Sequence, residues 1–138
     1  MKTTILLFFG ILFNSYIYSQ VTFDNGETYY TDSTETVLCN GKFRKFYSGY
    51  KIKSVASFKA GKLNGDYHEY FENGLTKISA HYKLGLLEGE FLEYYPELNE
   101  MKLKTHYLIG VKHGEETTFD EVGEKIKTVF YENGVLKE

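Results

Sequence analysis

Residues 61–85 read GKLNGDYHEYFENGLTKISAHYKLG, and this stretch holds one complete unit of a pattern that returns along the rest of the chain. The motif G-x-x-x-G that opens it, at residues 61–65, recurs at residues 85–89 and 110–114, at steps of 24 and 25 residues. A further copy begins at Gly134, and an earlier half-unit begins at Gly41. A fixed period of this length is the signature of a repeat architecture, in which each copy is one supersecondary unit.

Aromatic residues keep the same period in two series. The first series is Phe46, Tyr70, Tyr94 and Phe119. The second series is Phe58, Tyr82, Tyr107 and Tyr131. Because equivalent positions of successive units fall in register, we expect both series to form structural ladders that supply the core.

Each unit has the pattern of a β-hairpin. Residues 65–71 and 76–83 are rich in β-formers, and the Asn-Gly pair at residues 73–74 between them is a hairpin turn signal. The G-x-x-x-G segments are then expected to be the return turns, with the turn glycines Gly61, Gly65, Gly85, Gly89, Gly110 and Gly114. With 13 Tyr, 11 Phe, 13 Gly and a single Pro in 138 residues, the composition also favours short strands and glycine turns. We therefore predict an all-β fold, an elongated meander of stacked antiparallel β-hairpins in an open sheet or solenoid.

The chain divides into three parts. Residues 1–19 are interpreted as a signal peptide, because the apolar run at residues 5–13 is too short to span a membrane and Ser19 precedes a plausible cleavage point. The alternative is an uncleaved N-terminus that anchors the protein. Residues 20–40 are expected to form a capping strand region, and residues 41–138 the repeat domain, with units at about 41–60, 61–84, 85–109, 110–133 and a partial unit at 134–138. The interpretation predicts export to the periplasm, the cell envelope or the medium.

Charge is distributed unevenly along the chain. The formal net charge of −3 argues against general nucleic-acid binding. Residues 21–40 carry four acids and no bases, whereas residues 41–65 carry seven bases and no acids. We expect the basic run to be either a solvated face, a patch neutralised by acids on neighbouring strands, or a site for an anionic partner.

The unit pattern GKxxGxYxxYxxNGxxKxxxxYxxG, in residues 61–85 and with changes in residues 107–134, resembles the variant MORN repeat (membrane occupation and recognition nexus). Such arrays occur in bacterial proteins labelled antitoxin-like. The resemblance covers residues 41–138 and implies stacked antiparallel hairpins in a twisted sheet that serves as a scaffold or binding module. The chain departs from the pattern at Glu116 and Asp120, which replace aromatic residues, and at Gly49-Tyr50, which shifts the first turn.

Candidate catalytic and metal-binding groups are sparse. The histidines are His68, His81, His106 and His113. His81 and His106 occupy equivalent repeat positions, but no Cys or acid shares their register at zinc-ligand spacing. The acid pairs at residues 115–116 and 120–121 are adjacent on a strand and therefore point to opposite faces. Cys39 is the only cysteine and is interpreted as an ordinary free thiol. We predict that the protein is not an enzyme and needs no cofactor or metal.

The sequence is therefore expected to encode an exported, non-enzymatic repeat module that binds a protein or envelope component through its sheet face. The alternative is an antitoxin or immunity-like protein of a toxin–antitoxin module. A protein is the expected partner, with an anionic lipid or polysaccharide as the second option and no nucleic acid. The candidate binding surface consists of Tyr67, Phe71, Phe91, Tyr95, Lys51, Lys53 and Lys59.

Overall fold

The structure, a computed structural model, describes residues 23–24, 29–30 and 38–137. These residues form strands and turns and contain no helix, so the all-β meander predicted from the repeat is confirmed. Accordingly, no helix in this part of the chain is long and apolar enough to cross a membrane. The proposed signal peptide and most of the proposed capping region lie outside the described residues.

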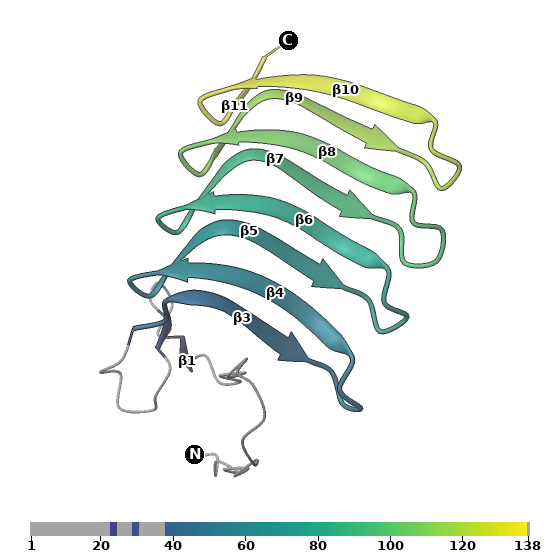
Figure 1. The fold of residues 1–138 in the computed structure, drawn as a ribbon. Helices are drawn as coiled ribbons and strands as arrows, with labels where there is room; N and C mark the ends of the chain where they lie inside the picture. The colour runs from purple at the N-terminus through teal and green to yellow at the C-terminus, as the bar shows by residue number, and fades with distance from the viewer. Residues whose placement is uncertain (1–22, 25–28, 31–37, 138) are drawn as a thin grey trace, which may run out of the picture.

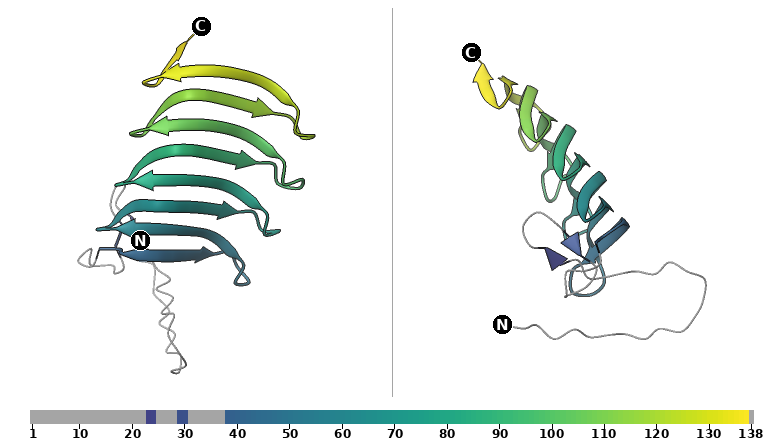
Figure 2. Two further views of the ribbon diagram at one scale, coloured as in Figure 1. Left: turned by 45° about the horizontal axis from the view of Figure 1, so that its top comes forward. Right: turned by 90° about the vertical axis from the view of Figure 1, so that its left-hand side faces the viewer.

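Nine strands make one open sheet whose order follows the chain, with every neighbouring pair antiparallel (Figure 1). They are β3 (Gly41–Phe46), β4 (Ile52–Lys59), β5 (Lys62–Tyr70), β6 (Thr76–Lys83), β7 (Leu86–Tyr94), β8 (Met101–Leu108), β9 (Val111–Phe119), β10 (Lys125–Glu132) and β11 (Val135–Lys137). Two short strands, β1 (Phe23–Asp24) and β2 (Tyr29–Tyr30), pair with each other. Seen edge-on, the nine-stranded sheet is a single layer (Figure 2).

Two-residue turns join successive hairpins on one side of the sheet, at the left in Figure 1, which we call the short-turn side. Both residues of each turn have positive φ. This is the requirement of the type I′ turn, whose twist matches that of the flanking strands. The four turns are Ala60-Gly61, Leu84-Gly85, Ile109-Gly110 and Asn133-Gly134.

Each short turn is also bonded to the preceding hairpin. The amide of Gly85 donates to the carbonyl of Leu63 at 2.7 Å, and the amide of Leu84 donates to Asn64 Oδ1 at 3.2 Å. The equivalent glycine amides donate from Gly61 to Cys39, from Gly110 to Leu87 and from Gly134 to Lys112, and the preceding amides from Ala60 to Asn40, Ile109 to Glu88 and Asn133 to His113. The repeat period of the sequence is thus a repeat of hydrogen bonds that holds each hairpin to the one before it.

The second glycine of each G-x-x-x-G motif has a different place from the one predicted. The sequence interpretation put both glycines in the return turn, but Gly65, Gly89 and Gly114 lie inside β5, β7 and β9. At each of these positions the strand has two more residues than the strand that pairs with it. In β5, for example, the three residues 64–66 lie opposite the single residue Ser57. Such a bulge needs positive φ, which is +112° at Gly65, and glycine reaches it without a Cβ clash.

One face of the sheet packs large side chains between small ones. Directly opposed residues across successive strands are Phe43, Ala56, Tyr67, Ala80, Phe91, Thr105, Glu116 and Val129. Ala56, Ala80 and Thr105 are buried in this row. Alternation of large and small residues lets the rings of neighbouring strands fill the gaps, so one layer builds a core.

Aromatic rings pair edge to face on this side, which we call the paired-ring face. The pairs are Phe43–Phe58 with ring centroids 5.5 Å apart, Tyr67–Tyr82 at 5.8 Å and Phe91–Tyr107 at 6.0 Å. In the last hairpin Glu116 takes the place of the first ring and bonds to the hydroxyl of Tyr131 and to Lys112. Lys112 Nζ also lies 4.9 Å from the centre of the Tyr131 ring, so a charged cluster replaces the aromatic pair.

The two predicted ladders lie on opposite faces. Phe58, Tyr82, Tyr107 and Tyr131 are on the paired-ring face, whereas Phe46, Tyr70, Tyr94 and Phe119 alternate onto the other face. That second face also carries the histidines, and we call it the histidine face. The two series separate because β4, β6, β8 and β10 each have one extra, unpaired residue directly after the first residue of the strand. This bulge shifts the pairing by one residue, so the side chains that follow it point to the other face.

We expect Thr105→Val to raise the free energy of unfolding by about 1 kcal/mol, because Thr105 is 1% exposed and its hydroxyl has no hydrogen-bond partner within the described part of the chain. Valine keeps the shape and removes the unsatisfied group. Equilibrium urea unfolding measures the change. Thr117→Val is the control: the hydroxyl that it removes lies 3.0 Å from the Thr128 hydroxyl, so this variant should lose stability. A loss of stability in Thr105→Val would contradict the expectation that its hydroxyl is unfavourable.

Ile109→Asn is expected to stabilise the fold by about 1 kcal/mol. Ile109 has φ of +51° and is 67% exposed, and a β-branched residue is disfavoured in the left-handed region. Asn133 occupies the same turn position in the next hairpin and tolerates this conformation. Thermal unfolding of the two proteins tests the expectation, and a lower midpoint for the variant would show that the isoleucine is needed for the fold.

Candidate functional site

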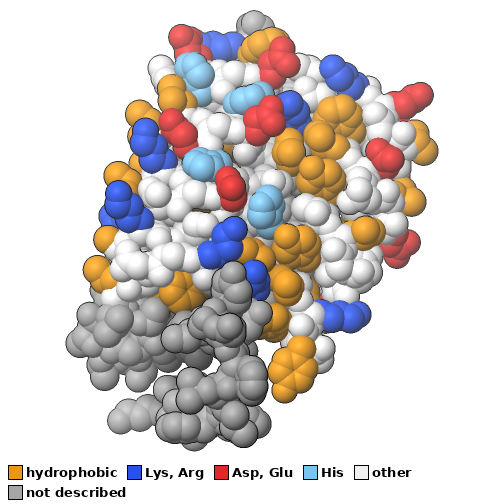
Figure 3. Space-filling view, viewed as in Figure 1, with side chains coloured by type: hydrophobic (Ala, Val, Ile, Leu, Met, Phe, Trp, Pro, Cys, Tyr) orange, Lys and Arg blue, Asp and Glu red, His pale blue; other side chains and the backbone are white. Residues whose placement is uncertain are grey.

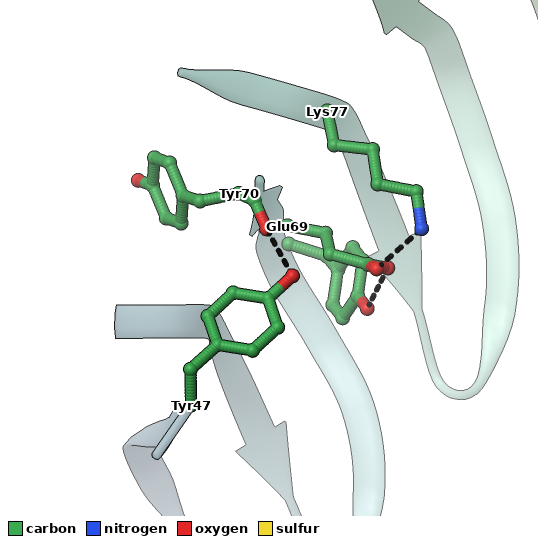
Figure 4. Close-up of polar contacts among 5 residues, drawn as sticks. Tyr47, Glu69, Tyr70 and Lys77 are labelled. Carbon is green, nitrogen blue, oxygen red and sulfur yellow. Dashed lines mark hydrogen bonds and ion pairs between the residues drawn. The ribbon is translucent and has the colours of Figure 1, made fainter. Parts of the chain in front are cut away.

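A row of acid–lysine pairs runs along the paired-ring face near the longer turns. Glu69 accepts a hydrogen bond from Lys77 at 2.8 Å, and Glu93 accepts one from Lys102 at 2.7 Å. Both lysines are the extra residue of their strand, and the bulge turns them toward this face. These hydrogen bonds, more than the accompanying charge attraction, raise the pKa of Lys77 and of Lys102. Figure 4 shows the Lys77–Glu69 contact.

The first hairpin departs from this row at two positions. Lys45 stands in the register position that Glu69 and Glu93 occupy in the next hairpins, so a base replaces the acid. Ser54, directly opposite Lys45, stands where the later hairpins have Ile78 and Leu103. A small side chain therefore replaces a large aliphatic one beside the exchanged charge.

A hollow of about 190 Å³ opens at this position. The described residues that line it are Phe43, Lys45, Lys53, Ser54, Ala56, Phe58, Leu63, Tyr67 and Glu69. Ser54 is only 7% exposed. The Glu69 carboxylate on the rim also accepts a hydrogen bond from the Tyr67 hydroxyl at 3.2 Å, in addition to the bond from Lys77. The hollow thus combines apolar side chains, a serine hydroxyl and two lysines.

Three of the four aromatic residues of the predicted binding surface have side-chain partners within the protein. Tyr67 and Phe91 belong to the ring pairs. Tyr95 donates its hydroxyl to the carbonyl of Phe119 at 3.0 Å, as Tyr47 does to that of Tyr70 at 2.8 Å (Figure 4). Phe71 begins the turn between β5 and β6, where its amide bonds to Leu75. The ring pairs of Tyr67 and Phe91 link two strands of one hairpin, whereas the Tyr95 bond links one hairpin to the next.

The lysines of the predicted surface are spread over the molecule. Lys51 donates to the carbonyl of Glu72 at 2.9 Å on the long-turn side, and Lys53 lies 5.5 Å from the centre of the Tyr47 ring beside the hollow. Lys59 is exposed on the short-turn side. The basic run of the sequence is therefore divided between different surfaces.

The histidine face carries acid–histidine pairs across neighbouring strands. His81 Nδ1 is 2.9 Å from Asp66 Oδ1, and His106 Nε2 is 3.4 Å from Glu90 Oε1, which also binds Lys104 at 2.6 Å. The bond from His81 lowers the pKa of Asp66, and the bond from Lys104 lowers that of Glu90. Figure 3 shows the histidine side chains gathered on this face. Within the described ranges, no group of three or more His, Cys, Asp or Glu side chains is placed to hold a metal ion.

Cys39 is fully buried against the first ring pair. Burial raises the pKa of its thiol, and nearby Lys45 opposes that shift. A buried thiol with a raised pKa is a poor nucleophile, so the structure favours the ordinary free thiol expected from the sequence.

A band of hydrophobic side chains crosses the right half of the histidine face in Figure 3. By strand alternation, the hydrophobic residues of this face toward the long-turn side include Phe46, Tyr70, Tyr94, Phe119, Val55 and Leu92. The four rings stand on every second strand, about 9.5 Å apart at the usual strand spacing. All four are partly exposed. We call these six residues the apolar band.

No protein-family model, no curated protein and no solved structure matches this chain. Function is therefore inferred from the residues and their geometry.

Proposed function

We propose that this chain is a binding module, a repeat scaffold that presents one face of its sheet to a protein partner. The observation that supports this most is the apolar band on the histidine face. Side chains such as Tyr70 and Tyr94 stay partly exposed on a rigid sheet, and partly exposed aromatic residues with a polar surround are enriched in protein interfaces. The turn-to-turn hydrogen bonds hold these rings at a fixed spacing, which lowers the entropy lost on binding.

The band borders polar groups that add specificity. The His68 ring lies 6.4 Å from that of Tyr70, and the Asp66–His81 and Glu90–His106 pairs line the short-turn half of the same face. A partner that covers the band would therefore meet an apolar strip bounded by hydrogen-bonding groups. This is the usual division of an interface into a hydrophobic core and a polar rim.

Partner capture with matched variants tests the proposal. The full chain is immobilised beside the double variant Tyr70→Ser/Tyr94→Ser and the control Lys127→Ser on the paired-ring face, after circular dichroism has confirmed that all three fold. We expect a protein from the native host to be retained by the wild type and the control, and at least tenfold less by the double variant. Equal retention by all three would contradict this use of the face. If the retained protein is a toxin that the chain neutralises, the module is an antitoxin.

We also propose that the module is exported, on the basis of the apolar run at residues 5–13. Mass spectrometry of the protein from its native host should then find Gln20 as the N-terminal residue in the envelope or secreted fraction. An intact Met1 in a cytoplasmic fraction would contradict export and favour the antitoxin alternative.

A further inference from the structure

We infer that the hollow in the first hairpin is a binding site for a small organic anion, an apolar group of about the size of a benzene ring that carries a carboxylate. The site lies on the paired-ring face and is separate from the apolar band. It is independent of the partner proposed above.

The size of the hollow defines the apolar part of the ligand. A cavity of about 150 Å³ lined by apolar side chains binds benzene, and this hollow measures about 190 Å³. Phe43, Phe58, Leu63 and Tyr67 provide the apolar lining. Phe43 and Phe58 already meet edge to face there, so an entering ring or branched aliphatic group finds aromatic contacts of the kind the fold uses elsewhere.

The polar groups define the charged part. Lys45 and Lys53 both line the hollow, and Lys53 has no carboxylate partner within the described part of the chain. The nearest acid in the lining, Glu69, is bonded to Lys77 and to the Tyr67 hydroxyl. A carboxylate in the hollow would therefore balance the charge of Lys53 through a charge-assisted hydrogen bond.

Ser54 supports the same conclusion independently of charge. Ser54 lines the hollow and is 7% exposed. Its counterparts in the later hairpins are Ile78 and Leu103, so the small serine leaves the hollow open and places a hydroxyl group in it. A bound carboxylate would accept a hydrogen bond from this hydroxyl.

The repeat itself offers the controls. Ser54→Ile restores the residue type of the second hairpin and fills the hollow, and Lys45→Glu restores its acid. Both residue types are tolerated at the same register one hairpin along, so both variants are expected to fold. Lys125→Glu makes the same charge change in the last hairpin, away from the hollow, and serves as the matched control.

Binding is measured on the full chain by NMR titration with phenylacetate and with phenylacetamide, its neutral isostere. A short peptide ending in phenylalanine, with a free or an amidated C-terminus, shows whether the carboxylate is that of a small molecule or of a peptide end. We expect phenylacetate or the free peptide to shift the amide signals of Ser54 and Lys53, and the neutral forms to bind at least tenfold more weakly. Ser54→Ile and Lys45→Glu should each weaken binding at least tenfold, and Lys125→Glu less than twofold.

Three results would overturn the inference. They are the absence of binding by every probe at millimolar concentration, equal binding of the charged and neutral forms, or unchanged binding by Ser54→Ile together with Lys45→Glu. Each leaves the capture experiment on the apolar band unaffected, because the two sites lie on opposite faces and are tested with different variants.

Discussion

Replacing Phe58 with alanine is expected to lower the free energy of unfolding by about 3 to 5 kcal/mol, the usual cost of a large-to-small change in a packed core. Phe58 is 7% exposed and meets Phe43 edge to face, and it packs in one cluster with Cys39 and Ala56. Equilibrium urea unfolding followed by far-ultraviolet circular dichroism measures the effect.

Phe130→Ala is the matched control, because Phe130 is also a phenylalanine in a strand but is 51% exposed. This change should cost less than about 1 kcal/mol, as surface substitutions usually do. If Phe58→Ala cost no more than the control, the first ring pair would not be part of the core, and the account of how one layer holds together would be wrong.

Gly65→Ala is expected to destabilise the protein by about 2 to 3 kcal/mol, for two reasons that add. Gly65 has φ of +112°, which L side chains rarely adopt and which costs about 1 to 3 kcal/mol in a residue with a Cβ. The new Cβ would also lie 3.1 Å from the Cβ of Ser57 on the neighbouring strand. Because both atoms are fixed by the backbone, the strands must move apart or the bulge must change. Urea unfolding again gives the magnitude.

Gly89→Ala separates the two causes. Gly89 occupies the equivalent bulge of the next hairpin, with φ of +82°, but a Cβ there would meet nothing within 4 Å. It should therefore show the conformational cost alone, and be the milder change by about 1 kcal/mol. Equal losses for the two variants would mean that contact with Ser57 contributes nothing.

The strands and the long-turn hairpins are predictable from the sequence, because they depend on local signals. The steps of 24 and 25 residues are visible in the glycines and aromatic residues, and Asn73-Gly74 lies in the turn between β5 and β6. A motif such as residues 61–65 also located the return turns to within a few residues. It did not distinguish the turn glycine Gly61 from the bulge glycine Gly65, since both have positive φ and only the strand register separates them.

Which face each ring occupies was beyond the sequence pattern. Tyr70 and Tyr82 belong to series with the same period, yet they point to opposite faces because the one-residue bulge at Lys77 changes the register. The repeat period of the sequence does not reveal such a shift, although a one-residue slip moves every side chain that follows it to the other face of the sheet. Tyr67 was accordingly expected on a separate contact surface, whereas it packs against Tyr82.

The hollow was recoverable in principle. When the first unit is aligned with the second by the strand register of the structure, Lys45 takes the position of Glu69 and Ser54 takes the position of Ile78. The first turn, with Gly49-Tyr50 in place of Asn-Gly, obscures that alignment in the sequence. The lesson for repeat proteins is that departures from the unit pattern, rather than the pattern, indicate candidate sites.

Nuclear Overhauser contacts among aromatic rings test the central claim most directly, that the repeat folds into one open layer whose core is a row of ring pairs. The account predicts contacts within Phe43–Phe58, Tyr67–Tyr82 and Phe91–Tyr107, each linking two strands of one hairpin. It also predicts none between β3 and β10, because the sheet does not close. Contacts between Tyr70 and Tyr82 in place of Tyr67–Tyr82, or contacts joining β3 to β10, would contradict it.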